Sequence, residues 1–123
     1  MKVLLSIKPE YVEKIFAGTK KYEFRKSLFK KNDVKYVVIY ASAPIKRVVG
    51  EFEIKNVFSD DVDVIWNRTK KYSGITKAFY ESYFQNRKKA NAIQIGNIKK
   101  YEKTKLLSDY NIKQAPQSFC YIY

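Results

Sequence analysis

The sequence predicts an α+β fold, a small mixed β-barrel of five to six strands with two to three short helices. Several short runs alternate apolar and polar residues, as half-buried strands do, and one run of β-branched and aromatic residues is typical of a strand buried on both faces. The strands do not alternate regularly with helices, which argues against a doubly wound parallel sheet. Because 123 residues suffice for one core, we expect a single domain over residues 1–123.

The first half of the chain is expected to hold one helix and four strands. Val3 to Ile7 is a short apolar run that predicts a buried strand. A helix then opens at Lys8 and Pro9, where the missing proline N–H costs little, and Gly18 stands where a left-handed C-cap residue is needed. Three further strands are expected at residues 21–26, 36–41 and 47–58, the second of them central in the sheet.

The second half is expected to begin with two helices, over residues 61–69 and from Thr76 onward. Strands are expected at 92–98 and 118–123, whereas the pattern of 101–107 does not decide between strand and loop. Four aromatic residues recur at helical spacing after Thr76, and we interpret them as core rather than as platforms for base stacking: Phe79, Tyr80, Tyr83 and Phe84.

Composition excludes several classes of protein. Hydrophobic residues make up 46% and aromatic residues 16% of the chain, well above the content of a disordered basic tail. Cys120 is the single cysteine and there is no histidine, so the usual zinc sites and an internal disulfide are excluded. We expect no metal and no cofactor. The sequence shows neither a signal peptide nor a membrane-length apolar stretch, which predicts a cytoplasmic protein with no membrane partner.

The charge is strongly positive and unevenly distributed. Twenty-five Lys and Arg against twelve Asp and Glu give a net charge of +13, which attracts polyanions. Basic residues gather at 20–35 and 87–89, and acidic residues at 51–63. An alternative source of the charge is a genome-wide preference for Lys, Asn, Ile and Tyr, but the segregation of sign favours a basic face. RNA or a nucleotide-like anion is therefore the expected partner, with DNA as a possible one.

Short motifs spread along nearly the whole chain carry a family resemblance. The end of the first helix and the next strand contain a Gly-x-Lys-x-x-Glu-x-Arg pattern, Gly18-Thr-Lys20-Lys-Tyr-Glu23-Phe-Arg25. The other motifs, in order, are Ser6-Ile-Lys-Pro9, Tyr40-Ala-Ser-Ala-Pro44, Gly50-Glu-Phe-Glu53, Ser73-Gly-Ile75 and Pro116-Gln-Ser-Phe119. Together they resemble the ASCH family of the PUA-like fold, in particular small prokaryotic and phage proteins described as transcriptional regulators. The resemblance implies a PUA-like barrel with a cleft beside the first helix, and relatives that bind RNA or modified bases.

The Gly-x-Lys-x-x-Glu-x-Arg segment also supplies the strongest candidate site. On a strand, Glu23 and Arg25 point to one face. Arg25 can hold a phosphate or carboxylate through two parallel N–H bonds, Lys20 offers a compact charge, and Glu23 can orient either of them or accept a base N–H. The alternative is a structural ion pair between Glu23 and Arg25. We expect these three residues to form a basic cleft at the junction of the first helix and the second strand.

Five more residues are candidate ligand-binding groups. Lys8 stands at the start of the first helix, and Tyr40 is either a stacking platform or a core residue. Ser42, Gln117 and Ser118 fall at expected strand ends or loops, where barrel mouths collect hydrogen-bonding groups, and Gln117 has the amide needed to contact a base edge. Each of these three is equally well explained as a solvated turn residue.

We rank three functions. The first is an RNA- or nucleotide-binding module, with a regulatory role in view although no helix-turn-helix segment supports direct control of transcription. The second is a ribonuclease that works without metal, with Glu23 as base and Lys20 and Arg25 stabilising the phosphorane. The third is a protein-interaction or purely structural role. The resemblance also brings in amidohydrolases of acetylated cytidine, which use a Lys, a Thr and a distant Glu; Lys20 matches, but Glu23 stands at the Thr position and residues 71–74 contain no acid.

Overall fold

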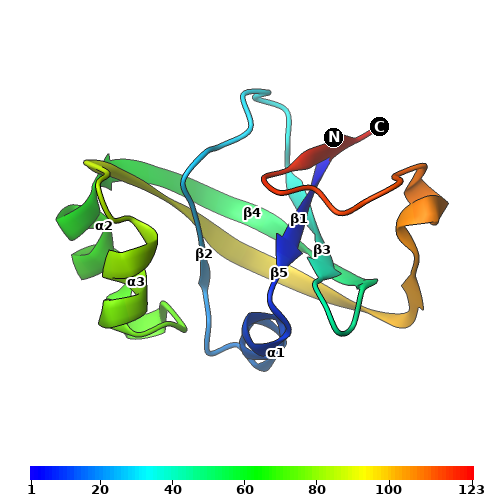
Figure 1. Cartoon of the computed structure of the whole chain (residues 1–123), viewed down its shortest axis with the longest axis horizontal. Helices are drawn as coiled ribbons and strands as arrows, with labels where there is room; N and C mark the ends of the chain where they lie inside the picture. Colours follow the sequence, from blue (N-terminus) through cyan, green and yellow to red (C-terminus); the bar gives the residue numbers. More distant parts are fainter.

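The computed structural model describes residues 1–123 and contains one six-stranded sheet with helices at one end and below it (Figure 1). The strand order is β2-β5-β4-β3-β1-β6. β1 and β3 run parallel, and every other neighbouring pair is antiparallel. The elements in chain order are β1 (Lys2–Ile7), α1 (Pro9–Ala17), β2 (Tyr22–Arg25), β3 (Tyr36–Ala41), β4 (Arg47–Asp61), α2 (Val62–Thr69), η1 (Lys70–Tyr72), α3 (Lys77–Tyr83), β5 (Lys89–Lys105), η2 (Leu107–Tyr110) and β6 (Cys120–Ile122).

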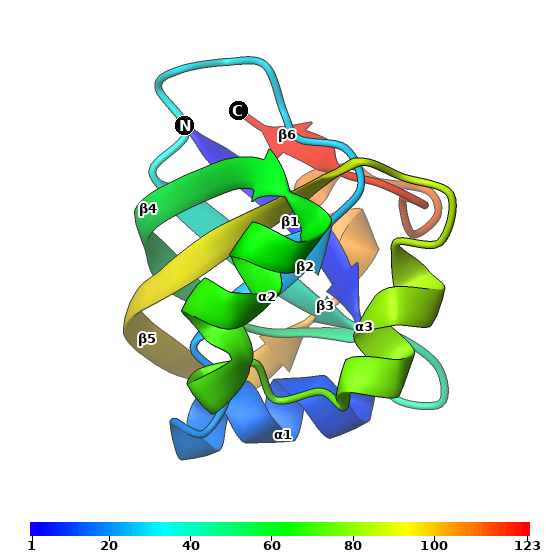
Figure 2. The same cartoon turned by 90° about the vertical axis from the view of Figure 1, so that its left-hand side faces the viewer.

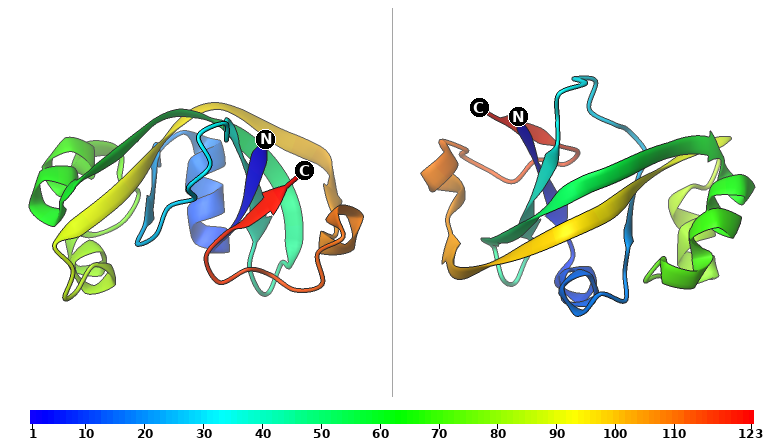
Figure 3. Two further views of the ribbon diagram at one scale, coloured as in Figure 1. Left: turned by 90° about the horizontal axis from the view of Figure 1, so that it is seen from above. Right: turned by 180° about the vertical axis from the view of Figure 1, so that it is seen from behind.

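The two long strands, β4 and β5, give the sheet its curl. Their pairing shifts register at three places between Val48 and Asn56, and such irregularities bend and twist a strand pair. Gly50 lies at one of them, and here the backbones approach closely, because an added Cβ would come within 2.6 Å of the Lys99 carbonyl oxygen and 2.9 Å of the Phe16 ring. Seen from above, the long strands β4 and β5 form an arch over α1 and β1 (Figure 3).

The sheet is curled but open, and the expectation of a closed barrel is wrong in this respect. β2 pairs only with β5 and β6 pairs only with β1, so the two edges do not meet in a hydrogen-bonded ladder. β2 has four residues and β6 has three, too few to complete a barrel wall. The α+β class and the six-strand, three-helix content are confirmed.

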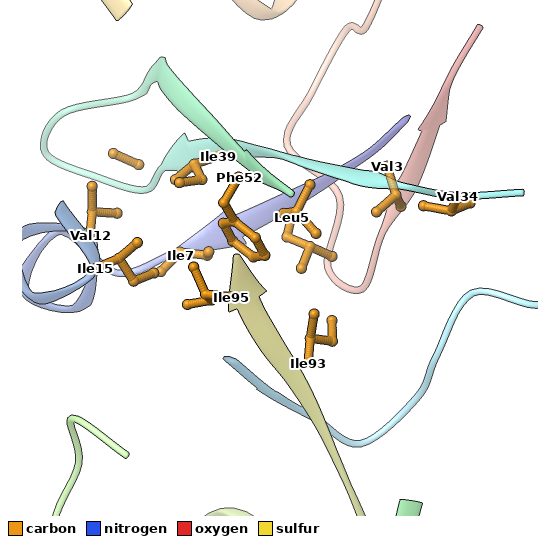
Figure 4. Close-up of a cluster of buried hydrophobic side chains, with 12 residues drawn as sticks. Val3, Leu5, Ile7, Val12, Ile15, Val34, Ile39, Phe52, Ile93 and Ile95 are labelled. Atoms are coloured by element: carbon orange, nitrogen blue, oxygen red, sulfur yellow. The ribbon is translucent and has the colours of Figure 1, made fainter. Parts of the chain in front are cut away.

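The main core fills the space between the arched sheet and α1. Val12 and Ile15 are the buried face of this helix. They pack with residues from β1, β3, β4 and β5 (Figure 4), and the full cluster is Val3, Leu5, Ile7, Val12, Ile15, Val34, Val37, Ile39, Ala41, Phe52, Ile93 and Ile95. All of β3 except its first residue is buried, which confirms the predicted central strand.

Two smaller clusters lie on either side of the main core. One joins α2 and α3 to β2 and β5, and contains Phe24, Ile65, Tyr80, Phe84, Ala90 and Ala92. The other, Leu4, Val38, Tyr40 and Val48, is packed beneath the segment that carries η2. Tyr40 therefore alternates with Ile39 and Ala41 along β3 and belongs to a different cluster from theirs.

The helix ends follow the predicted capping residues. Gly18 ends α1 with φ at +81°, and its N–H donates to the carbonyl oxygens of Ile15 and Lys14. Thr76 caps α3 by accepting a hydrogen bond from the Phe79 N–H at 3.1 Å. α1 and α3 are neighbours at the lower edge of the molecule in Figure 2. None of the helices is long and apolar enough to cross a membrane.

Candidate functional site

A cavity of about 140 Å³ lies where the end of β1, α1, β2 and α3 meet. These elements come together because β2 is the edge strand over which both helices fold, α1 from below and α3 from the side (Figure 2). The cavity is lined by Ser6, Ile7, Lys8, Tyr11, Lys20, Glu23, Phe24, Arg25, Ile75, Phe79 and Tyr83. Four of the predicted ligand-binding residues, Lys8, Lys20, Glu23 and Arg25, are thus in one place.

Lys20 is the most unusual residue of the cavity because only 2% of it is exposed. Its Nζ donates a hydrogen bond of 2.7 Å to the Ser73 carbonyl oxygen and lies 5.0 Å and 5.3 Å from the ring centres of Phe24 and Tyr11. Burial lowers the pKa of Lys20 below its ordinary value, and the nearby Glu23 carboxylate partly opposes this shift. Since Ser73 is the single hydrogen-bond partner, two of the three N–H donors remain available to a ligand.

The connection between η1 and α3 holds Lys20 in place. Gly74 packs against the aliphatic stem of Lys20 so tightly that an added Cβ would come within 2.6 Å of its Cβ and Cγ atoms. The Gly74 carbonyl oxygen also accepts a 3.0 Å hydrogen bond from Lys14 Nζ. The Lys21 N–H in turn donates to the Tyr72 carbonyl oxygen at 2.8 Å. The turn at Ser73 and Gly74 therefore fixes the position of the Lys20 side chain.

Glu23 and Arg25 form the predicted ion pair. Arg25 Nη1 lies 3.3 Å from Glu23 Oε2, with side-chain exposures of 13% and 9%. Arg25 Nη2 donates a 2.6 Å hydrogen bond to the Ser118 carbonyl oxygen, and Nη1 lies 3.5 Å from that of Ser6. The Arg25 guanidinium thus links the β2 edge to the end of β1 and to the segment before β6. The Arg25 side chain therefore both links these segments and forms a charged part of the cavity wall.

Aromatic rings make up much of the cavity wall. Phe79 and Tyr83 of α3 stack with their ring planes 13° apart and centres 6.3 Å apart, and Tyr11 of α1 lies 5.9 Å from Phe79. Lys8 Nζ lies over the Phe79 ring at 5.3 Å. Burial raises the pKa of both Tyr11 and Tyr83 above its ordinary value, so their hydroxyls stay protonated further into the alkaline range. The wall therefore offers flat apolar surfaces together with hydroxyl donors.

The four aromatic residues of α3 divide into two pairs. Tyr80 and Phe84 are 1% and 2% exposed and belong to the core, as predicted. Phe79 and Tyr83 are half-buried and line the cavity, so the prediction that all four are core residues is wrong for this pair. Their i, i+4 spacing places each pair on its own face of the helix, and this is the sequence feature that distinguishes them.

The remaining predicted site residues lie outside the cavity lining. Tyr40 is 6% exposed in the cluster below η2, because its side chain leaves β3 on the other face from Ile39. Ser42 begins the turn after β3 and its N–H donates to the Ile7 carbonyl oxygen at 3.0 Å. Gln117 is exposed, and Ser118 contributes a backbone carbonyl to Arg25 rather than its side chain. Ligand contacts of these residues remain predictions.

Taken together, the cavity suits a flat ring with polar edges. Three cationic side chains, Lys8, Lys20 and Arg25, outnumber the one carboxylate, Glu23, and aromatic rings complete the lining. Sequence reasoning missed several lining or supporting residues: Tyr11, Ser73, Gly74, Phe79 and Tyr83.

Comparison with known proteins places this site in context. A family model described as the ASCH domain matches residues 5–99, which include every residue of the cavity lining. The chain is 31% identical over 120 residues to the large ribosomal subunit protein uL22 of Ureaplasma parvum serovar 3, covering 98% of this chain and 39% of that protein. It is also 31% identical over 121 residues to the ATP synthase subunit alpha of the same organism, of which it spans 15%. The chain thus spans well under half of these two relatives.

Two further relatives come from Zymomonas mobilis. The chain is 29% identical over 89 residues to an ASCH domain-containing ribonuclease, covering 72% of this chain and 60% of that protein. The crystal structure of ASCH from this organism superposes with a TM-score of 0.89 at 25% identity, covering 99% of this chain and 87% of that one. A variant of the same protein with serine replaced by alanine gives a TM-score of 0.90. The family match over most of the chain and the shared architecture show that this chain belongs to the ASCH domain family, with its PUA-like fold.

Proposed function

We propose that the chain binds single-stranded RNA and takes one unpaired pyrimidine base into the cavity between α1, β2 and α3. The observation that carries this proposal is the size of the cavity, about 140 Å³. A cavity of about 150 Å³ in another protein is known to accept benzene, so this one has room for one six-membered ring. The two fused rings of a purine need more space. RNA with exposed bases is the form in which proteins read sequence through such pockets.

The polar groups of the cavity match the edge of a pyrimidine. Lys20 has two N–H donors without a protein partner, and they suit a base carbonyl oxygen. Glu23 uses Oε2 for Arg25 while Oε1 has no hydrogen-bond partner in the protein, so it can accept a base N–H. A carbonyl beside an N–H is the arrangement on uracil. Phe79 and Tyr11 supply ring faces for stacking.

Charge and relatives support RNA as the polymer. The net charge of +13 favours a polyanion over a neutral ligand. One relative is named as a ribonuclease and another as a large ribosomal subunit protein, and both names are consistent with an RNA partner. Similarity to one segment of an ATP synthase subunit supports a self-contained domain that occurs attached to unrelated proteins. Binding of DNA in place of RNA is the outcome that competition with duplex DNA detects.

The test is equilibrium binding of fluorescein-labelled oligonucleotides in EDTA. We expect oligouridine and oligocytidine to bind more tightly than oligoadenosine, and duplex DNA to compete weakly. Lys20→Met keeps the apolar stem but removes the donors, and loss of a hydrogen bond to a charged group should weaken binding roughly tenfold or more. Lys99→Met, an exposed lysine on the far half of β5, is the matched control. Equal affinity for all bases, or no effect of Lys20→Met, would overturn the base-pocket proposal.

A ribonuclease is the second candidate, and two observations favour it. One is the relative named as an ASCH domain-containing ribonuclease. The other is the presence in one cavity of Glu23 and of Lys20, whose pKa burial lowers from its ordinary value. In this mechanism the Glu23 carboxylate takes the proton of a 2′-hydroxyl, the 2′ oxygen attacks phosphorus, and the 5′ oxygen leaves with a proton from Lys20, while Arg25 stabilises the phosphorane.

The two candidates place different parts of the RNA in the cavity, a base in the first and a phosphate in the second. A gel of end-labelled RNA distinguishes them. Cleavage that disappears in Glu23→Gln, with binding retained, supports the ribonuclease. Intact RNA after long incubation with saturating protein, both with EDTA and with added magnesium, supports the binding module.

A further inference from the structure

Apart from the cavity, the surface has a depression at the turn between α3 and β5, which we call the basic depression. It has no apolar residue in its lining, which consists of Lys26, Gln85, Asn86, Arg87, Lys88, Lys89 and Asn91. The cavity by contrast is lined by six hydrophobic residues among eleven. This basic depression is therefore built to contact a hydrated, charged group and not a ring.

The basic depression has a defined backbone. Asn86 adopts a positive φ of 64°, and the Arg87 N–H donates to the Phe84 carbonyl oxygen at 3.0 Å, which turns the chain sharply after α3. Asn91 on β5 donates from Nδ2 to the carbonyl oxygens of Arg25 and Lys26 at 3.1 Å and 3.2 Å. Asn91 Oδ1 accepts from Ser59 at 2.6 Å. Asn91 thus fixes the end of β2, and with it Lys26, against β5.

Three of the four cations in the basic depression are not neutralised. Lys89 forms an ion pair of 2.8 Å with Asp61 and is therefore occupied. Lys26 Nζ lies 4.8 Å from the ring centre of Tyr83, and Arg87 and Lys88 form no ion pair. Lys26, Arg87 and Lys88 are all exposed. Such a group of unpaired cations on one concave surface attracts the phosphates of a nucleic acid.

Two residues connect the basic depression to the cavity. Tyr83 lines the cavity, and Lys26 Nζ lies over its ring. Arg25 lines the cavity and directly precedes Lys26. A chain that leaves the cavity past Tyr83 meets Lys26 first and then the turn at Arg87 and Lys88.

We infer that the basic depression holds the phosphates of the nucleotides that neighbour the one bound in the cavity, so that a single RNA strand runs from the cavity past Tyr83 to Lys26, Arg87 and Lys88. The inference rests on the proposed binding of RNA at the cavity. It gives the bound RNA strand a path across the surface and a minimum length, because a lone nucleoside reaches the cavity but not the basic depression. Proteins that bind single strands commonly combine a ring platform with a cationic groove in this way.

The experiment measures RNA affinity as a function of salt. The triple variant Lys26→Gln, Arg87→Gln, Lys88→Gln is compared with the control Lys99→Gln, Lys103→Gln, Lys113→Gln, which removes the same charge from exposed lysines elsewhere. For a single strand, each neutralised phosphate contributes about 0.7 to the slope of log K against log salt. We expect the triple variant to lower the slope by about 2, to weaken binding of a short oligouridine roughly tenfold or more, and to leave the affinity for uridine itself unchanged.

The outcomes separate this inference from the proposal on which it rests. If the wild-type protein binds oligouridine but the two triple variants have the same slope, the charge acts diffusely and the phosphate path is wrong. If the triple variant of Lys26, Arg87 and Lys88 also loses affinity for uridine, these residues maintain the structure of the cavity and do not bind the RNA strand. The inference is then again overturned. If the wild-type protein binds no RNA at any salt concentration, the proposed function fails and the inference falls with it.

Discussion

Gly74 lies directly against the side chain of Lys20, leaving no room for a methyl group between them: an added Cβ would meet the Lys20 stem at 2.6 Å. Its φ of +71° is also one that residues with a Cβ rarely adopt. This glycine, some fifty positions away in the sequence, therefore determines where the buried ammonium points, since the preceding residue, Ser73, accepts its hydrogen bond.

The first prediction concerns Gly74→Ala. We expect it to lower the free energy of unfolding by about 2 to 5 kcal/mol, because backbone strain of about 1–2 kcal/mol adds to overpacking against Lys20 of about 1–3 kcal/mol. Gly18→Ala is the matched control, since Gly18 has a similar φ of +81° but open space around it. Urea denaturation measures both. Equal losses in the two variants would mean that contact with Lys20 contributes nothing.

The second prediction concerns the pH dependence of stability that Lys20 causes. Burial lowers the folded-state pKa of Lys20, so the unfolded chain binds more protons above that pKa. The free energy of unfolding should therefore rise with pH from the folded pKa up to the unfolded pKa of about 10.4, and the cost of the buried charge is fully present below this window. Lys20→Met should remove this rise.

Denaturation of the wild type and Lys20→Met at several alkaline pH values tests the second prediction. The difference between the two proteins isolates Lys20, because the other lysines and tyrosines titrate in both. A constant difference across the pH range would show that Lys20 keeps an ordinary pKa.

Local elements and the charged residues of the cavity followed from the sequence, whereas the open sheet and the aromatic wall of the cavity did not. The uninterrupted β-branched run predicted β3, and Gly18 and Thr76 predicted helix ends, because each depends on neighbouring residues alone. The open sheet depends instead on bulges between β4 and β5, which a pattern of alternation does not reveal. Residues 101–105 proved to extend β5.

Placement of the site residues shows the same limit. Lys20, Glu23 and Arg25 were found because they occur together in one motif. Tyr40 was expected to be either a stacking platform or a core residue, and the structure places it in the core, on the other face of β3 from the main cluster. Phe79 and Tyr83 reach the cavity only because α3 packs its Tyr80 and Phe84 face into the core, a tertiary contact that helical spacing alone does not orient.

The third prediction separates the two faces of α3. Phe79→Ala should weaken RNA binding roughly tenfold, because stacking of a base on an aromatic ring contributes about 1–3 kcal/mol. It should change stability little, since Phe79 is only half-buried. Tyr80→Phe should leave RNA binding unchanged and lower stability. The Tyr80 hydroxyl donates a 2.7 Å hydrogen bond to the Val62 carbonyl oxygen, and this contact contributes about 1 kcal/mol to the free energy of unfolding.

Fluorescence anisotropy with labelled oligouridine and thermal denaturation together test the third prediction. Tyr83→Phe serves as a milder variant that keeps the ring and removes the hydroxyl. If Phe79→Ala binds RNA as the wild type does, the aromatic wall is not a stacking surface, and a ligand without a ring would have to be considered for the cavity.

The last prediction concerns Arg25, whose guanidinium joins three segments of the open sheet. Arg25→Ala should lower the free energy of unfolding by about 2–4 kcal/mol, because the hydrogen bond to Ser118 disappears and the buried Glu23 carboxylate loses its partner. Pairing with Glu23→Gln in a double variant should recover part of this loss, since the uncompensated charge is then removed. Arg25→Lys should recover less than half, because an ammonium does not reach two acceptors in the plane that a guanidinium spans.

A single denaturation series on these variants decides between the two roles of Arg25. Full stability of Arg25→Ala with weakened RNA binding would assign Arg25 to the ligand alone, and a loss of stability that Glu23→Gln does not reduce would locate the effect in the bond to Ser118.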